Sequence, residues 1–238
     1  MRVVFISQAV LNKNNGGGQF VRSLSGLLRK AVGVDNVTVI SLPDQNDTAL
    51  YNRVEKNLII YEDSPSKIQM AKNVLSGCPK WVSTDIFEKI VDYIKKEKFD
   101  FVFLGFSTYE YLIKKIKKET GLPVFVMYQG ITPNTKKSRL VGASLIQKIK
   151  AYPSYQMVLK RERINAMLAD CNIVHNKRER DAFYHYYKKE PEMYLPVFIA
   201  DKFSDYKGEN PGYSDFSLLF IGSNFGPNLS GLKWFTEN

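Results

Sequence analysis

The stretch MRVVFISQAVLNKNNGGGQFVRSLSGLLRK, residues 1–30, decides the fold that the rest of the chain extends. Its apolar run at residues 3–6 is typical of a buried strand. Three glycines, Gly16, Gly17 and Gly18, follow a polar loop and precede a segment whose apolar residues recur at helical spacing. The pattern therefore predicts a strand, a glycine turn and a helix in direct succession.

The glycine turn is a candidate phosphate site. The first N–H groups of a helix have no partner within the helix, and the helix dipole is positive at that end. Because glycines lack Cβ atoms, an anion can approach their backbone closely. A flexible surface loop explains the three glycines equally well. Neither G-x-G-x-x-G nor G-x-x-x-x-G-K-[ST] is present, so neither dinucleotide binding nor a P-loop is specifically indicated.

Composition narrows the class of protein. The chain has 238 residues, 44% hydrophobic and 13% aromatic, which is typical of one large or two small globular domains. Its net charge of +10 favours an anionic partner, whether nucleic acid, lipid head groups or a phosphorylated substrate. Cys78 and Cys171 lack metal-ligand spacing and suggest a reducing compartment. No signal peptide and no apolar run of about 20 residues is visible, so we expect a cytoplasmic protein.

Short apolar runs alternate with amphipathic segments as far as residue 187. The runs lie at residues 3–6, 37–42, 58–61, 101–104, 124–128 and 172–175, and the intervening segments have helical periodicity. This alternation predicts an α/β fold with a doubly wound, mostly parallel, Rossmann-like sheet. In such sheets ligands bind beyond the carboxyl ends of the strands. The three glycines, residues 105–107 and residues 129–130 are all expected at that edge, and Ser107 or Thr108 is expected to cap the following helix.

The segment from residue 131 to residue 163 interrupts the alternation with basic residues. Apolar side chains are interleaved, and Glu162 is the only acid. Such a segment can lie on an anionic membrane or bind an anionic substrate. An equally simple interpretation is a solvated pair of helices that covers the sheet. Aromatic residues are few here, so nucleic-acid binding has little support beyond charge. The candidate cations are Lys136, Lys137, Arg139, Lys148 and Lys150.

The C-terminal part begins afresh after a polar linker. Residues 216–221 are typical of another buried strand, a second glycine-bearing loop follows, and residues 229–235 begin a helix. A strand, a loop and part of a helix cannot bury a core of their own. We therefore expect three units: an N-terminal domain at 1–203, a linker at 204–215, and the truncated start of a second domain at 216–238.

Together these segments resemble the GT-B glycosyltransferases, specifically the family 4-like, retaining group. The resemblance spans nearly the whole chain, and it depends on the order and spacing of motifs that are individually weak. The motifs are residues 3–7 with 16–18, ADCNIV at 169–174 after a long basic helix, residues 195–203, and LLFIGS at 218–223 followed by PN at 227–228, GL at 231–232 and WF at 234–235.

The resemblance implies two Rossmann-like domains with a cleft between them. The N-terminal domain would hold the acceptor, and the C-terminal domain most of a nucleotide-sugar donor. Gly16, Gly17 and Gly18 would contact the donor phosphates. No metal and no cofactor is expected, because helix dipoles and basic side chains stabilise the leaving diphosphate. The residues expected on the acceptor side of the cleft are Ser107, Tyr109, Gln129, Gly130, His175 and Asn176.

The sequence departs from the family pattern in two ways. Gln129 stands where many members carry a histidine, so no catalytic residue is assigned. The acidic motif that binds the donor sugar and ribose is expected beyond Asn238, so residues 1–238 should lack transferase competence.

Four functions remain open at this point, and one of them, nucleic-acid binding, is supported only by the net charge. The first is a glycosyltransferase of cell-surface polysaccharide synthesis that uses a lipid-linked or polysaccharide acceptor, peripheral on the inner face of the membrane. The second is a sugar-nucleotide epimerase of the same fold. The third is a non-catalytic Rossmann-like ligand-binding module, which the glutamine at position 129 keeps open.

Overall fold

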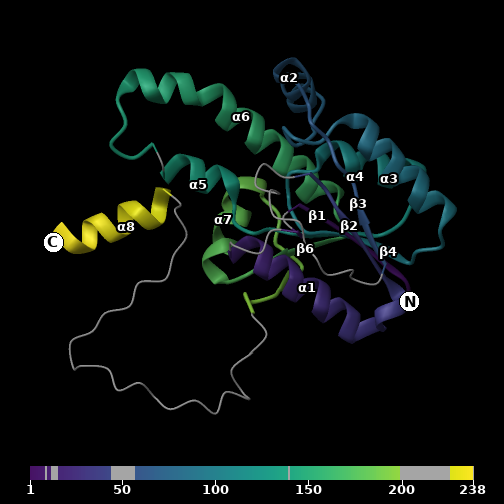
Figure 1. The fold of residues 1–238 in the computed structure, drawn as a ribbon. Helices are drawn as coiled ribbons and strands as arrows, with labels where there is room; N and C mark the ends of the chain where they lie inside the picture. The colour runs from purple at the N-terminus through teal and green to yellow at the C-terminus, as the bar shows by residue number, and fades with distance from the viewer. Residues whose placement is uncertain (9, 12–15, 44–56, 139, 199–225, 238) are drawn as a thin grey trace, which may run out of the picture.

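The described part of the chain folds around a seven-stranded sheet in which every paired strand is parallel to its neighbour. The computed structural model describes residues 1–8, 10–11, 16–43, 57–138, 140–198 and 226–237 (Figure 1). The order of the strands is β3-β2-β1-β4-β5-β6-β7. Helices flank the sheet, so the predicted α/β, Rossmann-like fold class is confirmed.

The elements follow the predicted order, with small shifts at their ends. The strands are β1 (Val3–Ser7), β2 (Val37–Ser41), β3 (Leu58–Ile60), β4 (Phe101–Leu104), β5 (Val124–Met127), β6 (Cys171–Val174) and β7 (Met193–Tyr194). The helices are α1 (Gly16–Val32), α2 (Lys67–Leu75), α3 (Thr84–Lys96), α4 (Glu110–Glu119), α5 (Thr132–Ser138), α6 (Leu145–Leu168), α7 (Lys177–Tyr187) and α8 (Gly226–Glu237), with a short 3₁₀ turn at Val34–Asn36.

The central strands β1, β4 and β5 are mostly apolar because both faces of the sheet are covered. All five residues of β1 are buried. Val3, Phe5 and Val39 belong to one core cluster with the apolar face of α1, while Val4 and Ile6 belong to a second cluster. The second cluster contains buried side chains of α3, α4, α6 and α7. The two faces are therefore packed by different sets of helices.

The direction of winding reverses between β1 and β4. The chain runs outward from β1 to β2 and β3, and then returns to pair β4 with the free side of β1, Val3 opposite Phe101. The carboxyl ends of β1 and β4 therefore lie side by side. Gly105 follows β4 so closely packed that a Cβ atom there would lie 2.5 Å from the Ser7 side-chain oxygen. This reversal is the place where doubly wound sheets bind ligands.

Helices α5 and α6 form a helical pair, as one interpretation of the basic segment predicted, but only the C-terminal part of α6 covers the sheet. The C-terminal part of α6 packs against the sheet and α4, and it buries Glu162, Asn165 and Ala166. The N-terminal part extends away from the sheet beside α5 (Figure 1). Its large apolar residues are exposed there, among them Leu145 and Ile149.

The C-terminal predictions are only partly within the described residues. The linker at 204–215 and the predicted strand at 216–221 lie outside them. Helix α8 includes the predicted helix at 229–235, so that element is confirmed. Leu229, Trp234 and Phe235 on α8 are exposed.

Candidate functional site

The three glycines form the first turn of α1 rather than a loop before it. Gly16 is exposed and Gly17 half-buried, whereas Gly18 is buried. A Cβ atom at Gly16 would meet no other atom within 4 Å. The positive end of the α1 dipole thus follows the carboxyl end of β1, where the winding reverses. Phosphate binding by this turn stays a prediction.

The connection between β4 and α4 points its polar groups inward. Ser107 Oγ donates a 2.6 Å hydrogen bond to Glu162 Oε1, and the Tyr109 hydroxyl accepts one of 2.9 Å from Gln8 N. Both Ser107 and Tyr109 are buried. The N-cap of α4 is Tyr109, which makes no side-chain cap. The prediction that Ser107 or Thr108 caps this helix is therefore wrong, and for Ser107 the reason is that its hydroxyl bonds a distant carboxylate.

The connection after β5 places Gln129 and Gly130 next to this loop. The half-buried Gln129 donates from Nε2 to the Gly105 carbonyl oxygen at 3.1 Å. Its amide oxygen accepts no hydrogen bond from the described residues. Gly130 has a φ of 133°, a conformation that side-chain-bearing residues rarely adopt. Gln129 thus joins the two loops through its amide nitrogen, and a ligand contact by this residue stays a prediction.

The connection after β6 contains one buried and one exposed predicted site residue, His175 and Asn176. His175 is buried, its ring packs edge-on against Phe20, and its Nδ1 lies 2.9 Å from the Leu195 carbonyl oxygen. Because a carbonyl only accepts, Nδ1 carries the proton. Asn176 is exposed and caps α7 by accepting from Glu179 N at 3.0 Å. His175 therefore joins α1 to the chain after β7, and a ligand contact by either residue stays a prediction.

The residue that the sequence analysis missed is Glu162. Its carboxylate has no exposed surface and accepts four hydrogen bonds. Ser107 Oγ and Thr132 Oγ1 donate to Oε1, while the Thr132 amide (3.1 Å) and the Tyr187 hydroxyl (2.5 Å) donate to Oε2. The sequence did contain an indication that this residue is buried. Glu162 is the single acid of a basic segment, and Asn165 and Ala166 follow it at helical spacing, three and four residues later.

Burial raises the pKa of the Glu162 carboxyl above its usual value, although the hydrogen bonds from Ser107, Thr132 and Tyr187 act in the opposite direction. A raised pKa in the folded state means that folding favours the protonated acid. The contribution of Glu162 to stability is therefore largest below its unfolded pKa and falls as pH rises through the folded value.

We accordingly expect the Glu162→Gln protein to gain stability relative to the wild type as pH rises from below to above the usual glutamate range, because glutamine does not ionise. Urea unfolding of both proteins at several pH values measures this difference. A difference that is independent of pH, or that changes in the opposite direction, would contradict the assignment.

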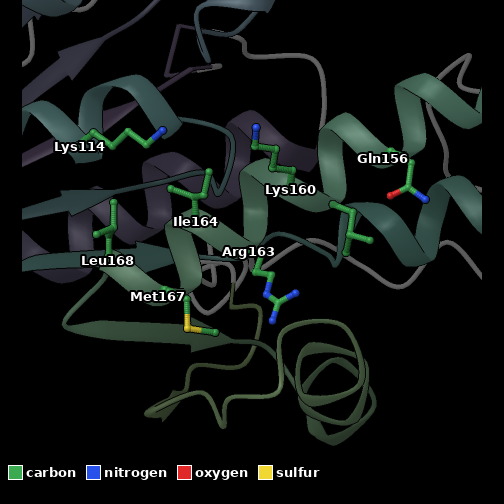
Figure 2. Close-up of a pocket in the computed structure, with 8 residues that line it drawn as sticks. Lys114, Gln156, Lys160, Arg163, Ile164, Met167 and Leu168 are labelled. Atoms are coloured by element: carbon green, nitrogen blue, oxygen red, sulfur yellow. The ribbon is translucent and has the colours of Figure 1, made fainter.

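A separate groove runs along α6 beside α4, and Lys114 of α4 lines it together with residues of α6 (Figure 2). Its volume is about 650 Å³. The side chains of Leu159, Ile164, Met167 and Leu168 supply apolar surface, and Lys114, Lys160, Arg163 and Gln156 add polar groups. None of the predicted cleft residues lines it. The groove therefore has apolar walls with cations beside them.

The basic residues predicted from the sequence are spread over α5 and α6. Lys136 Nζ donates to Ser154 Oγ and so ties the two helices together. Lys137, Lys148 and Lys150 are exposed, and none has an ion-pair partner among the described residues. Arg139 lies outside those residues. The exposed apolar side chains beside them are Val141, Leu145, Ile146, Ile149 and Tyr152.

Comparisons with known proteins identify the fold. No family model matches the chain, and no curated protein matches it. Among solved structures, sucrose-phosphate synthase from Thermosynechococcus elongatus is 15% identical with a TM-score of 0.56, over 82% of this chain and 48% of the synthase chain. A shorter chain of that synthase is 12% identical with a TM-score of 0.50, over 85% of this chain and 91% of the other. The chain thus spans about half of the longer synthase chain. These matches show that the chain shares a Rossmann-like α/β fold with part of that synthase.

Proposed function

We propose that this chain provides the acceptor-side half of a glycosyltransferase that takes a sugar from a nucleotide-sugar donor. The observation that carries the proposal is the meeting of three features where the winding of a GT-B-like sheet reverses. The glycine turn of α1 follows β1, Gly105 lies against Ser7, and Gln129 bridges to the Gly105 loop. The motif order that resembles the family 4-like, retaining group supports the same reaction.

The residues at this edge suit two steps of binding. The N–H groups and dipole of the first turn of α1 favour the donor diphosphate, whose charge grows as the sugar leaves. The Gln129 amide oxygen suits a sugar hydroxyl, because it is an acceptor held in place by the bond from Nε2 to Gly105. We propose that this electrostatic stabilisation replaces a metal ion.

We further propose that the acceptor is lipid-linked or a polysaccharide, and that the protein works on the inner face of the membrane in cell-surface glycan synthesis. Two surfaces support this. The exposed apolar and basic residues of α5 and α6 suit an anionic bilayer, and the α4–α6 groove suits an amphiphile. No helix in the described part of the chain has both the length and the apolar character of a membrane span.

Titration calorimetry with a panel of nucleotide sugars tests the donor half of the proposal. Residues 1–238 should bind in the millimolar range, about −4 kcal/mol, because most donor contacts are expected in the second domain. Micromolar binding would place the donor site in this half instead. With the complete protein, transfer of labelled sugar to a lipid acceptor supports the proposal. Interconversion of nucleotide sugars without an acceptor would indicate the epimerase, and binding without turnover the ligand-binding module.

A further inference from the structure

The buried face of α6 carries a carboxylate for which the proposed reaction has no direct use. Glu162 forms no ion pair with any described residue, so only hydrogen bonds compensate for the burial of its ionisable carboxyl group. A buried charge is costly, and an apolar side chain of similar volume often stabilises a core more. Packing alone therefore gives no reason for a glutamate at this position.

The donors to Glu162 come from the loops at the candidate site. Ser107 lies in the connection from β4 to α4, and Thr132 begins α5 at the end of the connection from β5. They supply three of the four hydrogen bonds, and Tyr187 of α7 supplies the fourth. The pairing of β4 with β5 ends at Leu104 and Val126, before the two loops begin. The Glu162 carboxylate thus connects two loops that strand pairing does not hold together.

A second side chain of α6 acts on the same loop. Asn165, one turn after Glu162, donates from Nδ2 to the Ser107 carbonyl oxygen. Residues three apart on a helix lie on one face, so α6 holds both the hydroxyl and the carbonyl of Ser107. Gln129 completes the arrangement, because its amide joins the β5 loop to Gly105 in the β4 loop.

We propose that Glu162 is a positioning residue that fixes the β4–α4 and β5–α5 connections relative to each other where the winding of the sheet reverses. Its carboxyl group accepts hydrogen bonds from both loops, and so it sets the distance between the loops at which Gln129 bonds to Gly105. Its consequence for ligand binding rests on the proposed function, because these loops are the ones expected to face the acceptor. The positioning itself does not rest on that function.

Hydrogen exchange measured by mass spectrometry, without any ligand, tests the positioning. In the Glu162→Ala protein, amides of residues 104–110 and 129–135 should exchange at least tenfold faster. The Thr132 amide is the most direct probe, because it donates to Glu162 Oε2. Amides of α3, which has no bond to Glu162, should change only as far as global stability changes.

Matched variants separate positioning from general loss of stability. Tyr187→Phe removes one hydrogen bond to the same carboxylate from outside the two loops, and it should leave their exchange unchanged. Ser107→Ala and Thr132→Val remove donors from the loop side, and each should loosen both loops even if Glu162→Ala does not fold. Glu162→Gln should restore slow exchange, because an amide can accept from the Thr132 amide and Tyr187 and donate to the two hydroxyls.

Two results would overturn the proposal. One is exchange in Glu162→Ala that rises equally in the two loops and in α3. The other is a Tyr187→Phe protein whose loops loosen as much as those of Ser107→Ala. The effect of positioning on ligand binding is measured separately, as nucleotide-sugar binding by the same variants of the complete protein. Weaker binding in Ser107→Ala but not in Tyr187→Phe is expected, and failure of the wild type to bind any nucleotide sugar would count against the proposed function alone.

Discussion

Reversing three exposed lysines of α5 and α6 should release the protein from anionic vesicles. Lys137, Lys148 and Lys150 have no ion-pair partner among the described residues, so their charges are available to a surface. A cation near an anionic membrane contributes about 1 kcal/mol, so removing three lowers the partition coefficient by roughly a hundredfold, and the new negative charges lower it further. Cosedimentation of the Lys→Glu triple variant with vesicles containing phosphatidylglycerol measures the effect.

A second triple variant controls for net charge. Lys67, Lys72 and Lys96 are exposed lysines on α2 and α3, and their reversal to Glu changes the charge of the chain equally. This control should keep most of the binding, and the wild type should bind less as salt rises. Two results would disprove docking through α5 and α6. One is wild-type binding to vesicles that does not depend on salt concentration, and the other is a control variant that loses as much binding as the Lys137, Lys148, Lys150 variant.

Substituting Gly17 by valine should cut the turnover of the complete protein at least tenfold, which corresponds to about 1.4 kcal/mol. A side chain in the first turn of α1 would keep a phosphate away from the backbone N–H groups. Valine has a higher helix propensity than glycine, so the helix itself should not be lost. Steady-state kinetics with a labelled nucleotide sugar provide the measurement, with thermal unfolding alongside.

The same helix offers the control for this substitution. Gly26 lies further along α1, is exposed, and has no other atom within 4 Å of the position of its Cβ. Gly26→Val therefore adds the same side chain to the same helix away from the expected phosphate. It should leave turnover unchanged. Equal turnover in the two variants would favour the interpretation of the glycines as an ordinary surface turn.

The sequence predicted the sheet well because its strands are buried on both faces. Such strands appear as continuous apolar runs, and β1, β4 and β5 lie where those runs lie. Strand β7 shows the limit of this signal. Met193 and Tyr194 are exposed, and a strand of two residues is too short for any periodicity to appear.

The candidate site was predictable only as a set of loops. Parallel strands bring their carboxyl ends to one edge, so the loops after β1, β4 and β5 had to meet. Which side chains turn inward depends on partners far away in the sequence. Ser107 points to a carboxylate 55 residues further on. The basic helix α6 likewise combines a buried polar face with an exposed apolar one, and no single periodicity describes both.

The pairing of β1 with β4 also determines when the domain can assemble. Arg2 and Asp100, which bond at the start of these strands, are separated by 98 residues. Closing so long a loop costs entropy before the central contacts repay it, and non-local pairing of this kind slows folding. During synthesis β1 can pair early only with β2, and its other edge must wait for about a hundred residues to leave the ribosome. Throughout that interval a strand that is fully buried in the folded protein has one open edge, which exposes it to non-native pairing and to chaperones.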